Sequence, residues 1–65
     1  MLNADLRLEM MQRDITLTEV AERLNMKLPN LSALMRRELT PQKRQLIADA
    51  IQTIDHERRN RRYAH

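Results

Sequence analysis

The apolar positions in the middle of the chain predict a short helix. Val20, Ala21 and Leu24 are spaced i, i+1, i+4, which places them on one helical face, while the charged residues between them face outward. Thr16, with Glu19 three residues later, has the pattern of a capping box, in which each side chain binds a backbone N–H that the first helical turn leaves without a partner. The sequence therefore predicts a helix of about two turns that begins near residue 17.

A tight turn and a second helix follow directly. Asn25 comes after the last apolar residue of the first helix, and asparagine often takes the left-handed conformation that ends a helix. Since the chain has no glycine, we expect Asn25 to make the turn. Pro29 suits a first helical turn, where its missing N–H costs nothing. The second helix is therefore predicted from about residue 28, with a buried stripe made of Leu31, Leu34 and Met35.

Two further helices are predicted on either side of this pair. Asn3 is expected to cap a first helix that runs to about Gln12, and Thr40 with Pro41 marks the start of a last helix. The last helix carries the widest apolar stripe of the chain, made of Leu46, Ile47, Ala50, Ile51 and Ile54. We thus predict an all-α fold, a small bundle of about four helices, over residues 1–54. Residues 55–65 have no apolar periodicity, and we expect a frayed helix end followed by a basic tail there.

The segment VAERLNMKLPNLSALMRR, residues 20–37, resembles the helix-turn-helix of the lambda-repressor/Cro-type family of bacterial and phage DNA-binding proteins. The apolar, small and turn positions of that family match seven residues here, namely Val20, Ala21, Leu24, Asn25, Met26, Leu31 and Leu34. The resemblance can be followed from about Leu6 to Ile54. It implies a lambda-repressor-like fold and a sequence-specific, repressor-like transcriptional regulator whose second helix, around residues 28–37, enters the major groove. The alternative is a helical hairpin with no role in DNA binding.

This chain departs from the family pattern in two places. Where the family commonly pairs an Arg with a Glu, Met10 and Met35 stand here, so we expect an apolar contact in place of the ion pair. The family also usually has two shorter helices where this chain has one unbroken pattern after Pro41.

The resemblance also implies which residues contact DNA. The base-contacting positions of the family fall on Lys27, Leu28, Pro29 and Ala33, with Asn30 and Ser32 nearby. Because leucine, proline and alanine can contact only thymine methyl groups, specificity is expected to rest on Lys27, Asn30 and Ser32, or on DNA shape. The candidates for phosphate contacts are the flanking hydroxyl and basic residues Thr16, Thr18, Arg36, Arg37, Thr40 and Lys43.

Composition excludes several other classes of protein. The 65 residues include no Cys, Trp or Phe, which excludes disulfides and thiolate metal sites and argues against aromatic platforms for single strands. Eight of the twelve Lys and Arg residues lie in 36–65, against four of the nine acids, so the C-terminal half is expected to attract polyanions. No apolar run is long enough to span a membrane and the N-terminus lacks a signal-peptide pattern, so we expect a cytoplasmic protein.

No catalytic or metal-binding pattern is present in the sequence. His56 and His65 both lie in the expected tail, where a solvated histidine is the ordinary case. Without glycine there is no loop of the kind that cradles phosphates. We therefore predict a protein that is not an enzyme and that has no cofactor, no metal and no small-molecule substrate.

Two hypotheses about partners follow. The first is double-stranded DNA, and the second is a protein-interaction role, as a small adaptor or anti-regulator that uses an exposed surface made of Leu28, Pro29 and Ala33. We also hypothesise a homodimer through the last helix, because its apolar stripe is wider than one small core needs. The alternative to the homodimer is a monomer in which the first helix covers that stripe.

Overall fold

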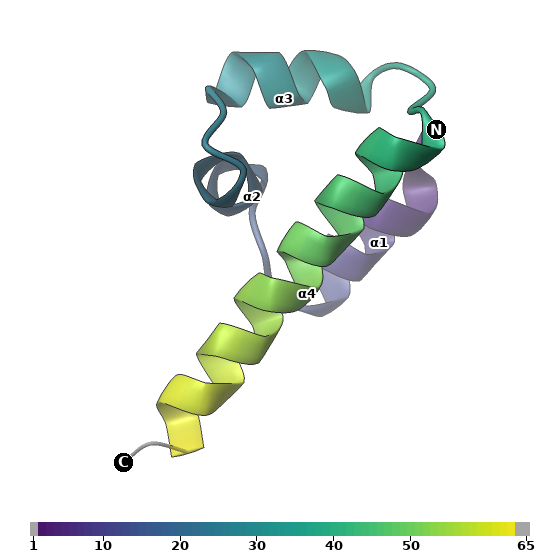
Figure 1. Cartoon of the computed structure of the whole chain (residues 1–65). Helices are drawn as coiled ribbons and strands as arrows, with labels where there is room; N and C mark the ends of the chain where they lie inside the picture. Colours follow the sequence, from purple (N-terminus) through teal and green to yellow (C-terminus); the bar gives the residue numbers. More distant parts are fainter. Residues whose placement is uncertain (1, 64–65) are drawn as a thin grey trace.

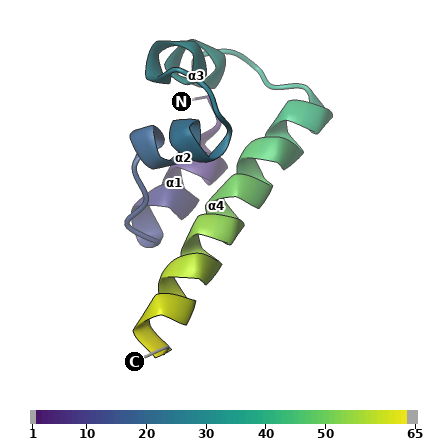
Figure 2. The ribbon, with the colours of Figure 1, turned by 60° about the vertical axis from the view of Figure 1, so that its left-hand side comes forward.

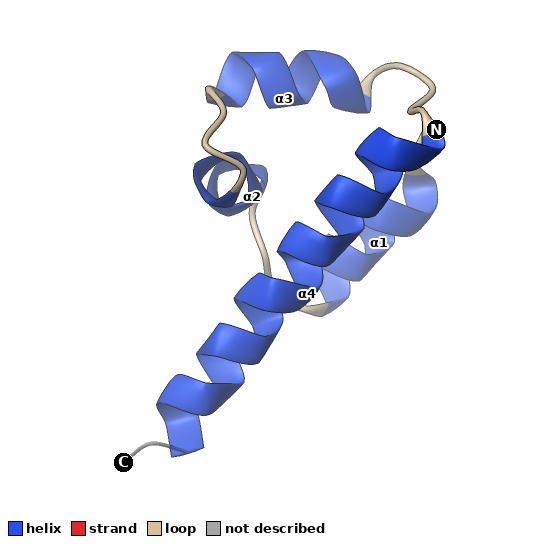
Figure 3. Ribbon diagram, in the orientation of Figure 1, coloured by secondary structure: helices blue, strands red, loops and turns tan. Residues whose placement is uncertain are grey.

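The computed structural model describes residues 2–63, and every regular element among them is a helix (Figure 1, Figure 3). The four helices are α1 (Ala4–Gln12), α2 (Leu17–Arg23), α3 (Leu28–Met35) and α4 (Pro41–Tyr63). The predicted all-α class and the predicted number of helices are confirmed. The bundle measures 40 × 21 × 18 Å, because α4 reaches well past the other three helices. As both views show, α3 lies at one end of the molecule and the last turns of α4 lie at the other (Figure 1, Figure 2).

The local signals for helix starts and turns are confirmed in the structure. The Thr16 hydroxyl accepts a hydrogen bond from the Glu19 N–H at 3.2 Å, and Glu19 Oε1 accepts one from the Thr16 N–H at 3.1 Å. Asn25 makes the turn with φ = 58°, in the left-handed region. The Thr40 hydroxyl accepts a hydrogen bond from the Lys43 N–H at 3.2 Å, which caps α4. Each of these signals acts within one helical turn and needs no distant partner.

The core lies where all four helices meet. Its largest fully buried side chains are Leu31, Met35, Ile47, Ile51 and Val20. Met10, expected to contact Met35 in place of an ion pair, is also buried in this core at 7% exposure. Burial of these side chains supplies most of the stability of so small a domain.

The apolar stripe of α4 is covered within a single chain, with one exception. Ile47, Ala50, Ile51 and Ile54 are all buried, whereas Leu46 is 58% exposed. One residue of the stripe, Leu46, is thus left uncovered, as expected for a stripe wider than one small core needs. Leu34 of α3, which was predicted to be buried with Leu31 and Met35, is only partly buried. Both leucines border the same hollow in the surface.

Asn3 does not cap α1 with its side chain, contrary to the sequence-based prediction. It precedes α1 with φ = 60°, and its side chain makes no capping hydrogen bond. The side chain is instead buried, at 7% exposure, and its Nδ2 donates to the carbonyl oxygens of Met35 and Arg37. Asn3 thus joins the start of the chain to the end of α3.

The predicted boundary at residue 54 is also corrected, because α4 continues unbroken to Tyr63. The chain has no glycine, and after Pro41 it has no proline, so nothing in its sequence breaks the helix. Contacts with the bundle hold the extension, since Asp55 binds Arg13 and Arg58 binds Glu19. His65 and the side chain of Arg62, which also belonged to the expected tail, lie outside the described residues.

Candidate nucleic-acid interface

The residues predicted to read bases lie on the outer side of α3. Lys27 precedes this eight-residue helix with extended backbone angles, and Pro29 occupies its first turn. Leu31 and Met35 are buried on the inner side, which fixes the rotation of the helix about its own axis. The opposite side therefore points to solvent, and of the six candidates Lys27, Leu28, Pro29, Asn30 and Ala33 are exposed while Ser32 is half-buried.

The C-terminal end of α3 is held by side chains from α1 and its leading residue. Asn3 Nδ2 donates to Met35 O at 3.1 Å and to Arg37 O at 3.0 Å, and an Arg7 guanidinium N–H donates to Met35 O at 3.3 Å. The last carbonyls of a helix have no partner within the helix, so these donors satisfy groups that would otherwise be left open. They also fix the direction in which the chain leaves α3.

Asn3 also connects the end of α3 to α4. The Asn3 side-chain oxygen accepts a hydrogen bond from Arg44 at 3.3 Å, and Arg44 also binds Asp5. The hydrogen bond from Arg44 holds the pKa of Asp5 below its ordinary value. Sequence reasoning missed this cluster, because its members are more than thirty residues apart along the chain.

Four cations surround the outer side of α3 and the start of α4. Lys27, Arg36, Arg37 and Lys43 are all exposed, and none of them forms an ion pair with an acid within the part of the chain that the structure describes. Arg37 borders one surface hollow with Asn30 and Ala33, and Lys43 borders the adjoining hollow. Three of the predicted phosphate contacts, Arg36, Arg37 and Lys43, therefore lie near the predicted base contacts.

The three threonines predicted to contact phosphates lie in two different places. Thr40 caps α4 next to Lys43, and it is exposed. Thr16 and Thr18 lie at the start of α2, whose seven residues separate them by about 10 Å from the turn into α3. The Thr16 hydroxyl is engaged in the capping box, whereas no such bond holds the exposed Thr18 side chain among the described contacts.

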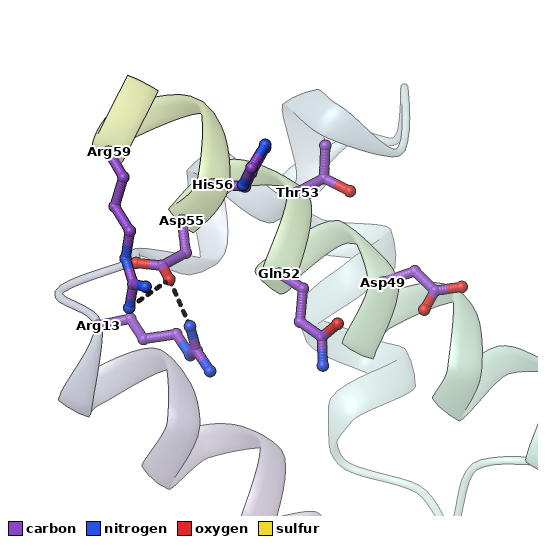
Figure 4. Close-up of a pocket in the computed structure, with 7 residues that line it drawn as sticks. All are labelled: Arg13, Asp49, Gln52, Thr53, Asp55, His56 and Arg59. Atoms are coloured by element: carbon purple, nitrogen blue, oxygen red, sulfur yellow. Dashed lines mark hydrogen bonds and ion pairs between the residues drawn. The ribbon is translucent and has the colours of Figure 1, made fainter. Parts of the chain in front are cut away.

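In a second arginine-rich region, at the far end of α4, Arg58 and Arg59 are paired with acids. Arg58 donates to the carbonyl oxygens of Arg13 and Asp14 at 3.3 and 2.7 Å and binds Glu19. Asp55 binds both Arg13 and Arg59 at the edge of an open polar hollow of about 680 Å³ (Figure 4). A further ion pair, 3.1 Å long, joins Arg23 to Glu57.

In the open hollow beside Asp55, the described contacts include no bond between a histidine and an acid. His56 is exposed, and its Nε2 lies 3.3 Å from the Asn60 amide nitrogen. Asp49, Gln52 and Thr53 occupy other turns of the same helix face, without an acid–base pair (Figure 4). Within residues 2–61, no group of three or more His, Cys, Asp or Glu side chains is placed to hold a metal ion.

Comparisons with protein-family models, curated proteins and solved structures found no match to this chain. The resemblance of residues 20–37 to the lambda-repressor/Cro-type family therefore stays a prediction, which rests on this chain's own residues. No helix among residues 2–63 has the length and apolar character needed to span a membrane.

Proposed function

We propose that this protein is a sequence-specific, double-stranded DNA-binding transcriptional regulator of the repressor type, in which α2 and α3 act as a helix-turn-helix. One observation carries the proposal. The outer side of the short helix α3 is exposed, and the four cations near it have no acidic partner in the described part of the chain. Polyanionic phosphates would supply the missing counter-charges.

In this proposal α3 lies in the major groove with its first turn against the base edges. Lys27 and Asn30 are the hydrogen-bonding residues best exposed there, whereas Ser32 is half-buried. Leu28, at 40% exposure, Pro29 and Ala33 would contact thymine methyl groups. Base reading would thus combine two polar contacts with an apolar surface that favours A·T pairs.

Four of the candidate phosphate contacts follow the C-terminal end of α3 in the chain. Arg36 and Arg37 follow its C-terminal end, and Asn3 and Arg7 hold the backbone that carries them. Thr40 and Lys43 lie at the N-terminal end of α4, where the helix dipole adds positive potential. A rigid backbone at these positions would let the cations meet phosphates at little cost in conformational entropy.

A homodimer through α4 stays a prediction, and its support is smaller than the sequence suggests. Of the five apolar stripe residues, only Leu46 is exposed, so a dimer through this face would have to rest on that residue and its polar neighbours. We therefore propose that one chain is the unit that binds a single half-site. Sedimentation at tens of micromolar protein, for the wild type and for Leu46→Gln, measures the oligomeric state directly.

The experiment that tests the proposal is a salt titration on a duplex of arbitrary sequence, followed by selection of bound sites from a random duplex pool. With three or four phosphate contacts, the logarithm of the binding constant should fall with the logarithm of salt concentration at a slope of about −3. The pool should then yield one enriched sequence pattern. Binding that is absent at low salt, or that is indifferent to salt, would remove the proposal.

A further inference from the structure

An apolar groove lies between the turn into α3 and the first turns of α4. One part of it has a volume of about 350 Å³ and is lined by Leu24, Met26, Leu34, Lys43, Leu46 and Ile47. The adjoining part, about 300 Å³, shares Met26 and Leu34 and adds Asn30, Ala33 and Arg37. We refer to the two parts together as the α3–α4 groove. Its lining residues come from the end of α2 with the turn that follows, from α3 and from α4, the helices labelled in Figure 1.

Leu46 makes the apolar surface of this groove continuous. A single exposed leucine needs no explanation, but Leu46 adjoins the partly buried side chains of Leu24, Met26 and Leu34, so the apolar surface is continuous. A continuous apolar surface beside charged residues is typical of an interaction site. The flexible thioether of Met26 can adapt its shape to an incoming side chain.

The charges at the rim determine what kind of partner fits. Arg37 and Lys43 are the charged residues that line the groove, and no acid lines either part of it. A second copy of this chain, docked about a two-fold axis, would bring these cations against their own equivalents, which costs free energy. Duplex DNA would meet mostly leucine, methionine and isoleucine side chains here, which offer its polar base edges no hydrogen bond, and only Asn30 and Ala33 of the lining are also base candidates.

We propose that the α3–α4 groove binds an acidic amphipathic helix from another protein. The apolar side chains of that helix pack on Leu34 and Leu46, and its carboxylates face Arg37 and Lys43. Another apolar hollow, bordered by Met11 of α1, has a single cation, Arg7, in its lining, so charge selects an acidic occupant less strongly there than beside Arg37 and Lys43.

The groove shares four residues with the proposed DNA interface. Asn30 and Ala33 are base-contact candidates. Arg37 and Lys43 are phosphate candidates, so an acidic helix in the groove neutralises charges that DNA requires. The partner therefore acts as an anti-regulator, whose binding and the binding of DNA exclude each other. This consequence rests on the proposed function, whereas binding of the helix itself does not.

The probe is a set of fluorescein-labelled synthetic peptides with Leu at i, i+3, i+4 and i+7 and Glu on the flanking positions, in several registers. One control set carries Lys in place of Glu, and another carries Ser in place of Leu. Saturable binding is expected for the acidic leucine peptides, with both control sets at least about tenfold weaker. Absence of saturable binding below about 1 mM, or equal binding by the lysine set, overturns the proposal.

Two matched variants locate the binding site. Leu46→Gln removes the exposed leucine of the groove, and Leu8→Gln removes an equally exposed leucine on α1, at 53% exposure. Glutamine keeps helix propensity, so both variants should retain the helical circular dichroism of the wild type. Peptide affinity should fall about tenfold for Leu46→Gln only. Unchanged affinity in Leu46→Gln, or an equal loss in Leu8→Gln, overturns the assignment to the groove.

DNA titrations separate this inference from the proposed function. Without peptide, DNA binding tests the proposed function alone; with peptide, the acidic leucine set should displace DNA from the wild type but not from Leu46→Gln. Peptide binding without any DNA binding would refute the regulator and leave the groove assignment standing. A loss of DNA affinity in Leu46→Gln, together with no peptide binding, would assign the groove to DNA and overturn the inference.

Discussion

At the α3 end of the molecule, Arg36, Arg37 and Lys43 are exposed and have no acidic partner among the described residues. At the far end of α4, Arg58 binds Glu19 and two backbone carbonyls, and Arg59 binds Asp55. Counted along the sequence, both regions are basic, since residues 36–44 have four Lys and Arg against one acid and residues 55–65 have four against two. In three dimensions, Arg58 and Arg59 bind Glu19 of α2 and Asp55 of α4, while Arg36 and Arg37 face solvent.

The comparison separates two uses of arginine that a charge count cannot distinguish. An unpaired, exposed guanidinium can bind a phosphate and releases counterions when it does so. A guanidinium that already donates to carbonyl groups and a carboxylate must first give up those bonds. We therefore assign the α3 end to binding and the far end of α4 to stability, and four predictions test this division.

The largest effect is expected from removal of residues 55–65. This truncation deletes the contacts of Asp55 with Arg13 and of Arg58 with α1 and α2, so it should lower stability by about 2–3 kcal/mol and the Tm by roughly 10 °C. Thermal unfolding followed by circular dichroism measures it. Removal of residues 62–65 alone deletes none of these contacts and is the control. An unchanged Tm after the longer deletion would mean that the extension is not part of the fold.

The next effect concerns the anchor at the end of α3. In Asn3→Gly, glycine tolerates φ = 60°, but the two hydrogen bonds from Asn3 Nδ2 to the carbonyl oxygens of Met35 and Arg37 are lost. The free energy of unfolding, measured in urea, should therefore fall by about 1–2 kcal/mol. Because the same bonds hold the backbone of Arg37, DNA affinity at temperatures where the variant is folded should fall too. A stability loss with unchanged DNA affinity would show that Asn3 does not position the α3 end.

Arginine substitutions test the comparison directly. Arg36→Ala and Arg37→Ala should each reduce the salt slope of DNA binding by ~1 and weaken binding about fivefold at physiological salt, for all duplexes alike. Arg59→Ala and Arg61→Ala, at the opposite end of the molecule, are the matched controls and should leave the slope nearly unchanged. Equal effects at both ends would abolish the division of roles.

The smallest effect is a change in pH dependence. The pKa of Glu19 lies below its ordinary value of 4.5, chiefly because the Thr16 N–H binds its carboxylate and also because Arg58 does. A lowered folded-state pKa means that this stabilisation is present above the unfolded-state pKa and is lost as pH falls through the folded-state value.

Glu19→Gln keeps an acceptor for the capping box but removes the charge. It should therefore lower stability slightly at neutral pH, where the charge stabilises the fold, leave stability at about pH 3 nearly unchanged, and so flatten the loss between about pH 5 and pH 3. Glu22→Gln, an exposed neighbour with no ion pair among the described contacts, is the control. Denaturant unfolding at several pH values makes the measurement, and parallel curves for wild type and Glu19→Gln would refute the role of this carboxylate.

The helix starts, the turns and most of the core could be predicted from the sequence alone. Thr16, Asn25 and Thr40 were recognisable because a cap or a left-handed turn involves atoms within about one helical turn of the chain. Apolar periodicity likewise identified Leu31 and Met35 as buried, since it needs only helical geometry. The outer side of α3 followed from the same periodicity, whereas the candidate DNA contacts on it were implied by the resemblance to the lambda-repressor/Cro-type helix-turn-helix.

Which side chains form hydrogen bonds and ion pairs between helices can be seen only in the tertiary structure. Asn3 and Arg58 reach partners 32 to 45 residues away, and no local signal specifies such contacts. Periodicity also could not show that Leu46 is the exposed residue of the α4 stripe, because it shows which residues share a face but not how far the neighbouring helices cover that face. The length of α4 was missed for a related reason: its last turns have no apolar stripe, and they are held by ion pairs that exist only once α1 and α2 have docked against them.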